Sequence, residues 1–292
     1  MQEFVYERPE SVADAVAAMH AGDAGTLAGG TDLVPQLREG RRTAERIVDL
    51  KHVADLSAIG VLPDGGVSIG SAACATAVAR HPVIAARYPA VARSAQLIGG
   101  VQVQNRASLG GNICNAAPSA DGVPALICLA AQALIAVPAG TREMPVDAMF
   151  AGPGRTMLGA GELLVAIRLP PAQPHSAAAY LRFTPRREMD IAVAGCGAWL
   201  RLGDDGAIAQ ARLVLASVAP TPIRAPAAER KLLGERPGAA LFEEAGRLAA
   251  QDARPISDTR GSAEFRRTLV AVLTARALAD CARQLGLEVV VL

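Results

Sequence analysis

Two glycine-rich segments, separated by about 70 residues, constrain this chain more than any other feature. They are Leu27-Ala28-Gly29-Gly30-Thr31-Asp32-Leu33 and Asn105-Arg106-Ala107-Ser108-Leu109-Gly110-Gly111-Asn112, and each brings an apolar, strand-like stretch to a Gly-Gly pair. Glycine adopts positive φ and has no Cβ, so such a segment lets backbone N–H groups approach a ligand closely. Two of them in one chain predict a site for a long anion held at two points, such as the diphosphate of a dinucleotide.

The residues around the glycines narrow the class of site. Thr31 and Ser108 would add hydroxyl donors beside the backbone amides. Neither segment has the G-x-G-x-x-G pattern of a Rossmann site or the Gly-Lys-Ser/Thr ending of a P-loop, so both of those nucleotide sites are excluded. A single Gly-Gly pair is more often an ordinary turn, and this alternative applies to each segment taken alone.

The charge balance excludes further classes of function. The 292 residues carry a formal net charge of +1, and the 29 basic residues are spread along the chain, so no footprint for nucleic acid or an anionic membrane surface is present. Aromatic residues make up only 3% of the chain, which argues against stacking platforms for single strands. Arginine supplies 27 of the basic residues, and the only lysines are Lys51 and Lys231. This bias is typical of the base composition of a genome and does not indicate a chemical role.

Cysteine and histidine usage predicts a reduced cytoplasmic protein without a metal site of its own. The five cysteines form no C-x-x-C pair, and no apolar leader is visible at the N-terminus. The four histidines have neither i,i+4 spacing nor a nearby cysteine. No Ser/His/Asp or Cys/His constellation is present, so we assign no catalytic side chain and no metal ligand.

The pattern of apolar residues divides the chain into units 1–55, 56–172 and 173–292. The first unit is predicted to be a small β-α-β unit. Its helix is indicated by apolar positions at helical spacing that follow the capping residue Ser11. Its expected elements are a strand at 4–6, a helix from residue 12, a strand at 25–28, a helical turn at 33–38 and a strand at 46–50.

The second and third units are expected to mix strands and helices. Segment 123–140 is nearly all apolar but is broken by Gln132 and flanked by Pro124 and Pro138, so we interpret it as a buried helix and strand, not a membrane span. The other elements expected in the second unit are a strand at 66–70, helices at 75–81 and 83–98, and a strand at 163–169. In the third unit we expect strands at 191–202 and 207–218 joined by a hairpin turn at 203–206, then helices at 226–233, 238–251 and 262–286.

These motifs together resemble the FAD-binding (medium) subunit of the molybdenum hydroxylases, the xanthine dehydrogenase and carbon monoxide dehydrogenase family. The resemblance covers essentially the whole chain. It is carried by segments 28–33, 98–113, 115–121, 124–126, 180–182 and 186–192. It implies an α+β fold, in which a two-part FAD-binding α/β domain precedes a C-terminal domain with an antiparallel sheet and three helices.

The resemblance also implies which residues bind FAD. The diphosphate would be cradled by the amides and hydroxyls of Leu27, Ala28, Gly29, Gly30, Thr31, Asp32, Leu33, Val34, Ser108, Leu109, Gly110, Gly111 and Asn112. Asp121 would accept hydrogen bonds from a polar part of the cofactor, or else cap a helix over 122–131. Ile98 and Leu164 would line the flavin or adenine pocket, core packing being the alternative, and Ile191 would lie against the isoalloxazine ring.

Two positions depart from the family pattern. Arg182 stands where relatives often have a lysine near the flavin, and the two side chains differ in geometry. Because lysine is rare throughout the chain, the replacement is also explained by composition. Ala117 stands where a serine or aspartate is often found, which argues against a side-chain contact there.

The leading hypothesis is an electron-transfer subunit that carries FAD. A small subunit with two-iron, two-sulfur clusters would deliver electrons from a large molybdopterin subunit, in a dimer of heterotrimers, and an external acceptor would remove them. The alternatives are a self-contained FAD oxidase or reductase and a flavin-free scaffold. The substrate of the assembly and its acceptor (NAD, quinone or oxygen) are not encoded in this chain's motifs.

Overall fold

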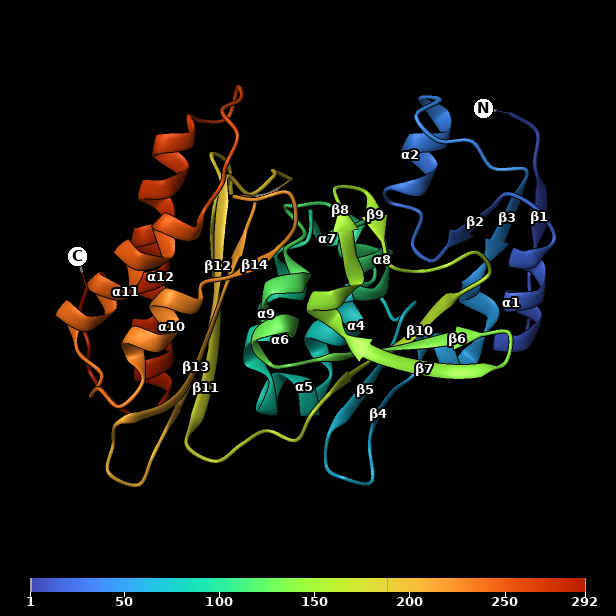
Figure 1. Cartoon of the computed structure of the whole chain (residues 1–292). Helices are drawn as coiled ribbons and strands as arrows, with labels where there is room; N and C mark the ends of the chain where they lie inside the picture. The colour runs from blue at the N-terminus through green and yellow to red at the C-terminus, as the bar shows by residue number, and fades with distance from the viewer. Residues whose placement is uncertain (1, 188, 292) are drawn as a thin grey trace.

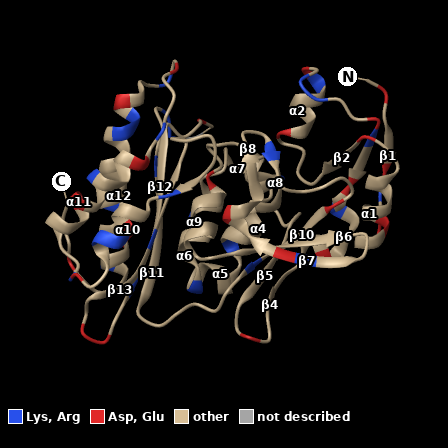
Figure 2. Ribbon diagram, in the orientation of Figure 1, with Lys and Arg blue, Asp and Glu red and all other residues tan. Residues whose placement is uncertain are grey.

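The computed structural model describes residues 2–187 and 189–291, which form three larger β-sheets and one two-stranded sheet (Figure 1). Glu188, which falls within one of the segments that resemble the family, lies outside the described residues. Within the described part of the chain, no helix is both long and apolar enough to span a membrane. In the view of Figure 2, Lys and Arg residues are interspersed with Asp and Glu residues along the ribbon.

The first sheet is parallel, with strand order β1-β3-β2. Its elements are β1 (Val5–Glu7), α1 (Val12–His20), β2 (Ala24–Leu27), α2 (Leu33–Arg38), β3 (Arg46–Asp49), the 3-10 turn η1 (Leu50–His52) and α3 (Ala54–Ser57). Ser11 caps α1 as predicted, because its hydroxyl accepts a hydrogen bond of 3.1 Å from the Asp14 amide. The predicted β-α-β unit is therefore confirmed.

The second sheet is antiparallel, with strand order β4-β5-β10-β6-β7. Its strands are β4 (Ile59–Val61), β5 (Val67–Gly70), β6 (Gln132–Val137), β7 (Gly140–Pro145) and β10 (Leu163–Leu169). The turn η2 (Val146–Met149) leads to a small hairpin of β8 (Phe150–Gly152) and β9 (Arg155–Thr156). The helix-to-strand interpretation of segment 123–137 is confirmed by α9 (Gly122–Cys128) followed by β6.

The helices between β5 and β6 differ from the sequence prediction in two places. They are α4 (Ala75–Arg80), α5 (Pro82–Arg87), α6 (Pro89–Gln96), α7 (Val101–Gln104) and α8 (Leu109–Cys114). The single helix expected over 83–98 is interrupted at Tyr88, because the residue before a proline avoids helical angles and Pro89 has no N–H to donate. The second glycine-rich segment does not follow a strand: α7 precedes it, and Gly110 and Gly111 lie in the first turn of α8.

The third sheet, of order β11-β12-β13-β14, is antiparallel and lies between two layers of helices (Figure 1). Its elements are β11 (Ser176–Phe183), β12 (Ala194–Leu202), β13 (Ile208–Ala216), β14 (Ile223–Arg224), α10 (Pro226–Leu232), α11 (Ala239–Asp252) and α12 (Ala263–Gln284). The predicted hairpin and three helices are confirmed, but the strand expected from residue 191 begins only at Ala194. Strand β11 was not predicted.

The two faces of this sheet enter different cores. Ala177, Cys196 and Leu213 pack against the C-terminal helices, whereas Tyr180 and Trp199 belong to the core that contains α6 and α9. The third sheet is therefore attached to the second unit through a continuous apolar layer. The division into units 1–55, 56–172 and 173–292 agrees with the membership of the three sheets, and its boundaries stay a prediction.

Gly246 tests the packing of α11 on α12. A Cβ built on Gly246 would lie 2.3 Å from the carbonyl oxygen of Ala271, so alanine would force the two helices apart. We expect Gly246→Ala to lower the free energy of unfolding by about 1–3 kcal/mol, measured by urea denaturation. At an ordinary helix position the same change raises it.

Gly60→Ala is the matched control, because a Cβ there meets no heavy atom within 4 Å. A Gly246→Ala variant as stable as the wild type or the control would contradict the close packing of the two helices.

Candidate functional site

The two glycine-rich segments are in direct contact. A Cβ built on Gly29 would lie 2.0 Å from the Arg106 carbonyl oxygen and 2.8 Å from the Ala107 nitrogen, so only glycine allows this approach. Residue 29 follows β2 at the carboxyl end of the parallel sheet, and residue 106 precedes α8. The sheet of the first unit is thereby joined to the helical layer of the second at the predicted site.

The first segment leaves a row of backbone donors free. Gly30 has φ of +78°, a left-handed conformation that turns the chain from β2 into α2. The carbonyls of Gly30 and Asp32 accept hydrogen bonds of 3.1 Å from Val34 and Gln36 in the first turn of α2. Among the described residues, the amides of Gly29–Asp32 have no protein acceptor. Clustered amides of this kind suit an anion.

The second segment forms the start of α8. The Ser108 hydroxyl accepts a hydrogen bond of 3.0 Å from the Gly111 amide, so it caps the helix and is not only a donor as the sequence suggested. The backbone of Gly110 approaches that of Ser71, where a Cβ would meet the carbonyl oxygen at 2.3 Å. The Asn112 side-chain oxygen accepts a hydrogen bond of 3.0 Å from the Gly122 amide, and this bond connects α8 to the start of α9.

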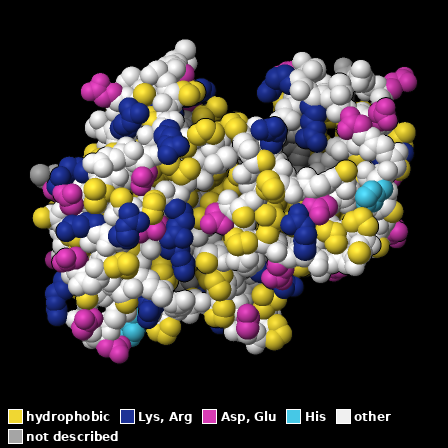
Figure 3. Space-filling model, in the orientation of Figure 1, with side chains coloured by type: hydrophobic (Ala, Val, Ile, Leu, Met, Phe, Trp, Pro, Cys, Tyr) yellow, Lys and Arg dark blue, Asp and Glu magenta, His cyan; other side chains and the backbone are white. Residues whose placement is uncertain are grey.

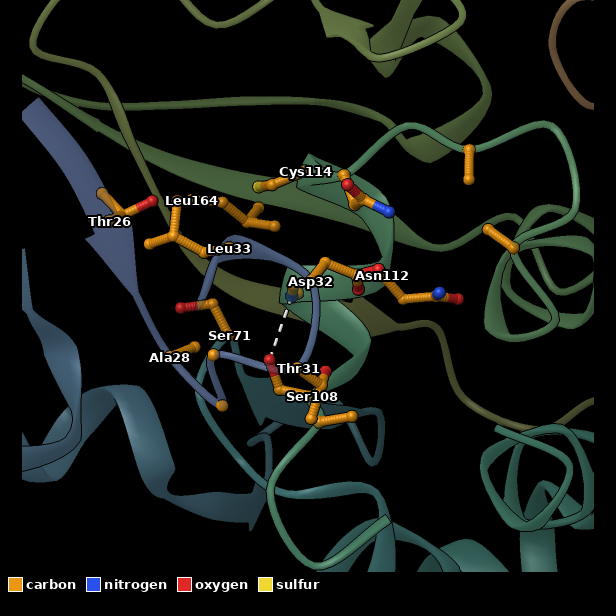
Figure 4. A pocket seen from close by; sticks show the side chains of 18 of the residues that line it. Thr26, Ala28, Thr31, Asp32, Leu33, Ser71, Ser108, Asn112, Cys114 and Leu164 are labelled. Carbon is orange, nitrogen blue, oxygen red and sulfur yellow. Dashed lines mark hydrogen bonds between the residues drawn. The ribbon is translucent and has the colours of Figure 1, made fainter. Parts of the chain in front are cut away.

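A cavity of about 550 Å³ opens between these segments. Side chains from β2, α2, α8 and β10 converge on it (Figure 4), and Figure 3 shows the surface hollowed between the part that carries α2 and the rest of the molecule. The predicted residues that line it are Ala28, Gly29, Gly30, Thr31, Asp32, Leu33, Ile98, Ser108, Gly110, Gly111, Asn112, Asp121, Leu164 and Ile191.

Four predicted residues lie outside the lining. Leu27 points beneath the Gly30 turn, where its Cδ1 would be 2.9 Å from a Cβ at that position. Val34 is 41% exposed on α2, and Leu109 is buried in the core. Arg182 lies behind the wall, where it forms an ion pair with Asp121.

Asp121 is held from the third sheet. The Tyr180 hydroxyl donates to one carboxylate oxygen at 2.8 Å, and the Arg182 guanidinium donates to the other. Asp121 makes no capping hydrogen bond to α9, so the capping alternative is wrong. Burial raises the pKa of Asp121 to about 6, although the charge of Arg182 and the two hydrogen bonds oppose that rise. The carboxylate is thus predominantly charged at neutral pH and anchored by β11.

Several residues that line the cavity belong to no sequence motif and were therefore not predicted. The turn after β9 contributes Leu158, Gly159 and Glu162, and the first unit contributes Met19, Thr26, Gln36 and Arg42. Gln36 donates a hydrogen bond of 3.2 Å to Asn115, which links α2 to the end of α8 across the cavity. These contacts depend on the packing of distant segments.

The remaining groups at the cavity favour binding over covalent chemistry. Burial raises the pKa of the Cys114 thiol to about 12, so this thiol is neutral and a poor nucleophile. Ile191 is 48% exposed at the cavity mouth, beside Asp190. The Asp190 carboxylate accepts a hydrogen bond of 2.8 Å from the amide of Ile191, and the Arg186 guanidinium lies 3.4 Å from it.

Comparison with known proteins gives the class of this site. A family profile described as the FAD binding domain in molybdopterin dehydrogenase matches residues 2–172, and the CO dehydrogenase flavoprotein C-terminal domain matches residues 179–281. The chain therefore belongs to the family of FAD-binding subunits of the molybdenum hydroxylases, which are oxidoreductases.

Particular relatives cover the whole chain. The xanthine dehydrogenase FAD-binding subunit of Escherichia coli O157:H7 is 35% identical over 284 residues, which are 96% of this chain and 97% of that protein. The carbon monoxide dehydrogenase medium chain of Hydrogenophaga pseudoflava is 32% identical and covers 94% of this chain and 96% of its own. A solved structure of carbon monoxide dehydrogenase from the same organism superposes with a TM-score of 0.92 at 31% identity, over 97% of this chain and 98% of that one.

The observed cavity fits FAD. Its volume lies within the range of about 300–1,000 Å³ that is usual for ligand pockets. Free backbone amides meet the demand of a diphosphate for hydrogen-bond donors, and Ile98, Leu164 and Ile191 supply apolar walls for planar rings.

Gly29→Ala tests the contact between the two glycine-rich segments. The added Cβ would push residue 29 away from the Arg106 carbonyl and separate the amides of the first segment from α8. We expect FAD affinity to fall at least about tenfold, or 1.4 kcal/mol, measured by fluorescence titration of the flavin-free chain.

Gly60→Ala is the control for Gly29→Ala. Gly60 does not line the cavity, and a Cβ there would meet no heavy atom within 4 Å, so little change in FAD affinity is expected. Equal affinities for wild type and Gly29→Ala would show that the contact does not hold the site together.

Asp121 gives a pH-dependent prediction. Its carboxyl titrates near 3.8 in the unfolded chain and near 6 in the folded one, so the folded chain binds more protons between these pH values. The stability that this site contributes is full below pH 3.8 and is lost as pH rises through 6, by about 3 kcal/mol at 1.36 kcal/mol per pKa unit. Urea denaturation of wild type and Asp121→Asn at several pH values checks this, because other titrating groups cancel in the difference. A stability difference that stays constant from pH 4 to pH 7 would refute it.

Proposed function

We propose that this chain is the electron-transfer subunit of a molybdenum-containing hydroxylase. It takes electrons from an iron–sulfur partner onto FAD and passes them to an external acceptor. The observation that carries the proposal is the contact of the two glycine-rich segments at the wall of one cavity, in a chain of the FAD-binding subunit family.

The proposed cofactor contacts follow from the lining of the cavity. The amides of Gly29–Asp32 and the start of α8 would hold the diphosphate, with the Thr31 hydroxyl beside them. Ile98, Leu164 and Ile191 would contact the ring systems, and Asp121 would accept a hydrogen bond from a polar edge of the cofactor. Bound flavin supplies both one-electron and two-electron transfer, which joins a single-electron donor to a two-electron acceptor.

In this proposal, the residues of this chain bind and orient the cofactor. Arg182 and Asp121 neutralise each other, so the pair presents fixed hydrogen-bonding groups and little net charge to the cavity. Tyr180 is fully buried against Asp121, which keeps this carboxylate in one orientation. We propose that Arg182 acts through Asp121 and not by direct contact, unlike the lysine of relatives.

The proposed partners are a small subunit with two-iron, two-sulfur clusters and a large molybdopterin subunit, assembled as a dimer of heterotrimers in the cytoplasm. The relative from Hydrogenophaga pseudoflava is named as the medium chain of its enzyme, which supports a multi-subunit assembly. Exposed apolar side chains near the cavity mouth also support a contact surface there. They are Val101, 61% exposed, Met189, 58% exposed, and Ile191.

Purification of the tagged chain from its native cell tests the assembly. We expect flavin absorbance, iron and molybdenum in one complex, with one smaller and one larger partner by mass. The chain separated from its partners should keep the flavin and lose both metals.

Either alternative would give a different result. A flavin-bearing chain that purifies alone and reduces an acceptor unaided would establish a self-contained flavoenzyme. A chain that carries no flavin in the complex or after reconstitution would leave only the scaffold.

A further inference from the structure

The charged groups that line the cavity are unequally matched. Among residues 2–187 and 189–291, four acidic residues line it, and Arg42 is the only lysine or arginine that does so. An incoming dianion therefore meets more negative than positive side chains, unless the carboxylates are compensated from behind.

Three of the four carboxylates are compensated in this way. Asp121 pairs with Arg182, Glu162 pairs with Arg142 at 2.6 Å, and Asp190 lies 3.4 Å from Arg186. None of these three arginines is among the residues that line the cavity. The fourth carboxylate, Asp32, belongs to the glycine-rich turn itself and forms no ion pair within the described part of the chain.

Arg42 supplies the positive charge among the described residues that line the cavity. It lies on the exposed loop between α2 and β3. Its backbone amide donates a hydrogen bond of 3.3 Å to the carbonyl oxygen of Gln36, a residue that lines the cavity. Its positive charge opposes the rise that burial causes in the pKa of the Cys114 thiol, at the end of α8. Within the described residues, no hydrogen bond or ion pair uses this guanidinium, so its donors are available to a ligand.

We propose that Arg42 is a binding residue for the cofactor's diphosphate and supplies the positive charge that this cavity otherwise lacks. The inference rests on the proposed function, because the dianion is that of FAD. A guanidinium suits this role, since it is always charged and donates to phosphate oxygens in a planar fork. The backbone amides of the glycine-rich turn then fix the position of the diphosphate, while Arg42 contributes positive charge from the loop that follows α2.

The neighbouring Arg41 provides a matched control. It lies on the same loop and carries the same charge, but it pairs with Glu39 at 2.6 Å and does not line the cavity. Replacing either arginine by glutamine changes the net charge of the chain equally. The charge of Arg41 opposes the rise in the pKa of Asp32 that burial causes, but only Arg42→Gln removes the charge of a residue that lines the cavity.

The test is a titration of the flavin-free full chain with FAD and with ADP, over a range of salt concentrations. We expect Arg42→Gln to weaken the binding of both ligands about tenfold at low salt, as for loss of one charge-assisted hydrogen bond. The salt dependence of Kd should also be flatter than in the wild type, because a screened charge is missing. Arg41→Gln should weaken binding clearly less than Arg42→Gln does, because Arg41 does not line the cavity, and Arg42→Lys should recover most of the affinity.

Each other outcome is decisive. An Arg42→Gln variant that binds like Arg41→Gln, or one whose loss of affinity is the same at all salt concentrations, would overturn the assignment of Arg42. The proposed function would survive either result, since wild-type FAD binding would be intact. A wild-type chain that binds neither FAD nor ADP would instead refute the proposed function.

Discussion

The close approach of Gly29 to the Arg106 carbonyl is the contact on which the site depends. It brings the end of a parallel sheet against the start of α8, so that both glycine-rich segments line one cavity. A single Gly-Gly pair is more often an ordinary turn, so the pairing of the two segments is what distinguishes this site. The absence of a Cβ at this one position therefore allows the first two units to line one cavity.

The third unit contributes to the same cavity through buried polar contacts. Arg266 is only 4% exposed, and its guanidinium donates hydrogen bonds of 2.7 Å to the Val193 carbonyl and 3.2 Å to the Ser217 carbonyl. Val193 follows Ile191 closely, and the Ser217 amide donates 2.8 Å to Pro118, in the segment that leads to Asp121. One buried cation thus braces two stretches of the cavity wall, because a buried guanidinium must find acceptors for its donors.

Local signals predicted much of the fold, and long-range packing accounts for what they missed. Ser11 marked α1, and the turn at 203–206 marked the hairpin, because capping and turn residues act within a few positions. Strand β11 was not predicted because its run of alanines is buried on both faces, so the sequence shows no alternation of apolar and polar residues. The glycine-rich segments located the site, whereas the pairing of Arg182 with Asp121, 61 positions apart, had no sequence signal.

Ligand binding in this cavity also affects the stability of the junction between the first and second units. The first unit joins the second through a small apolar cluster that includes Ala15, Val16, Leu56 and Leu163, apart from the contact at Gly29. A ligand held by amides from both units binds only when they are docked, so its binding free energy adds to the stability of that junction by mass action. The cavity thus links cofactor occupancy to the docking of the parallel sheet, without a separate conformational switch.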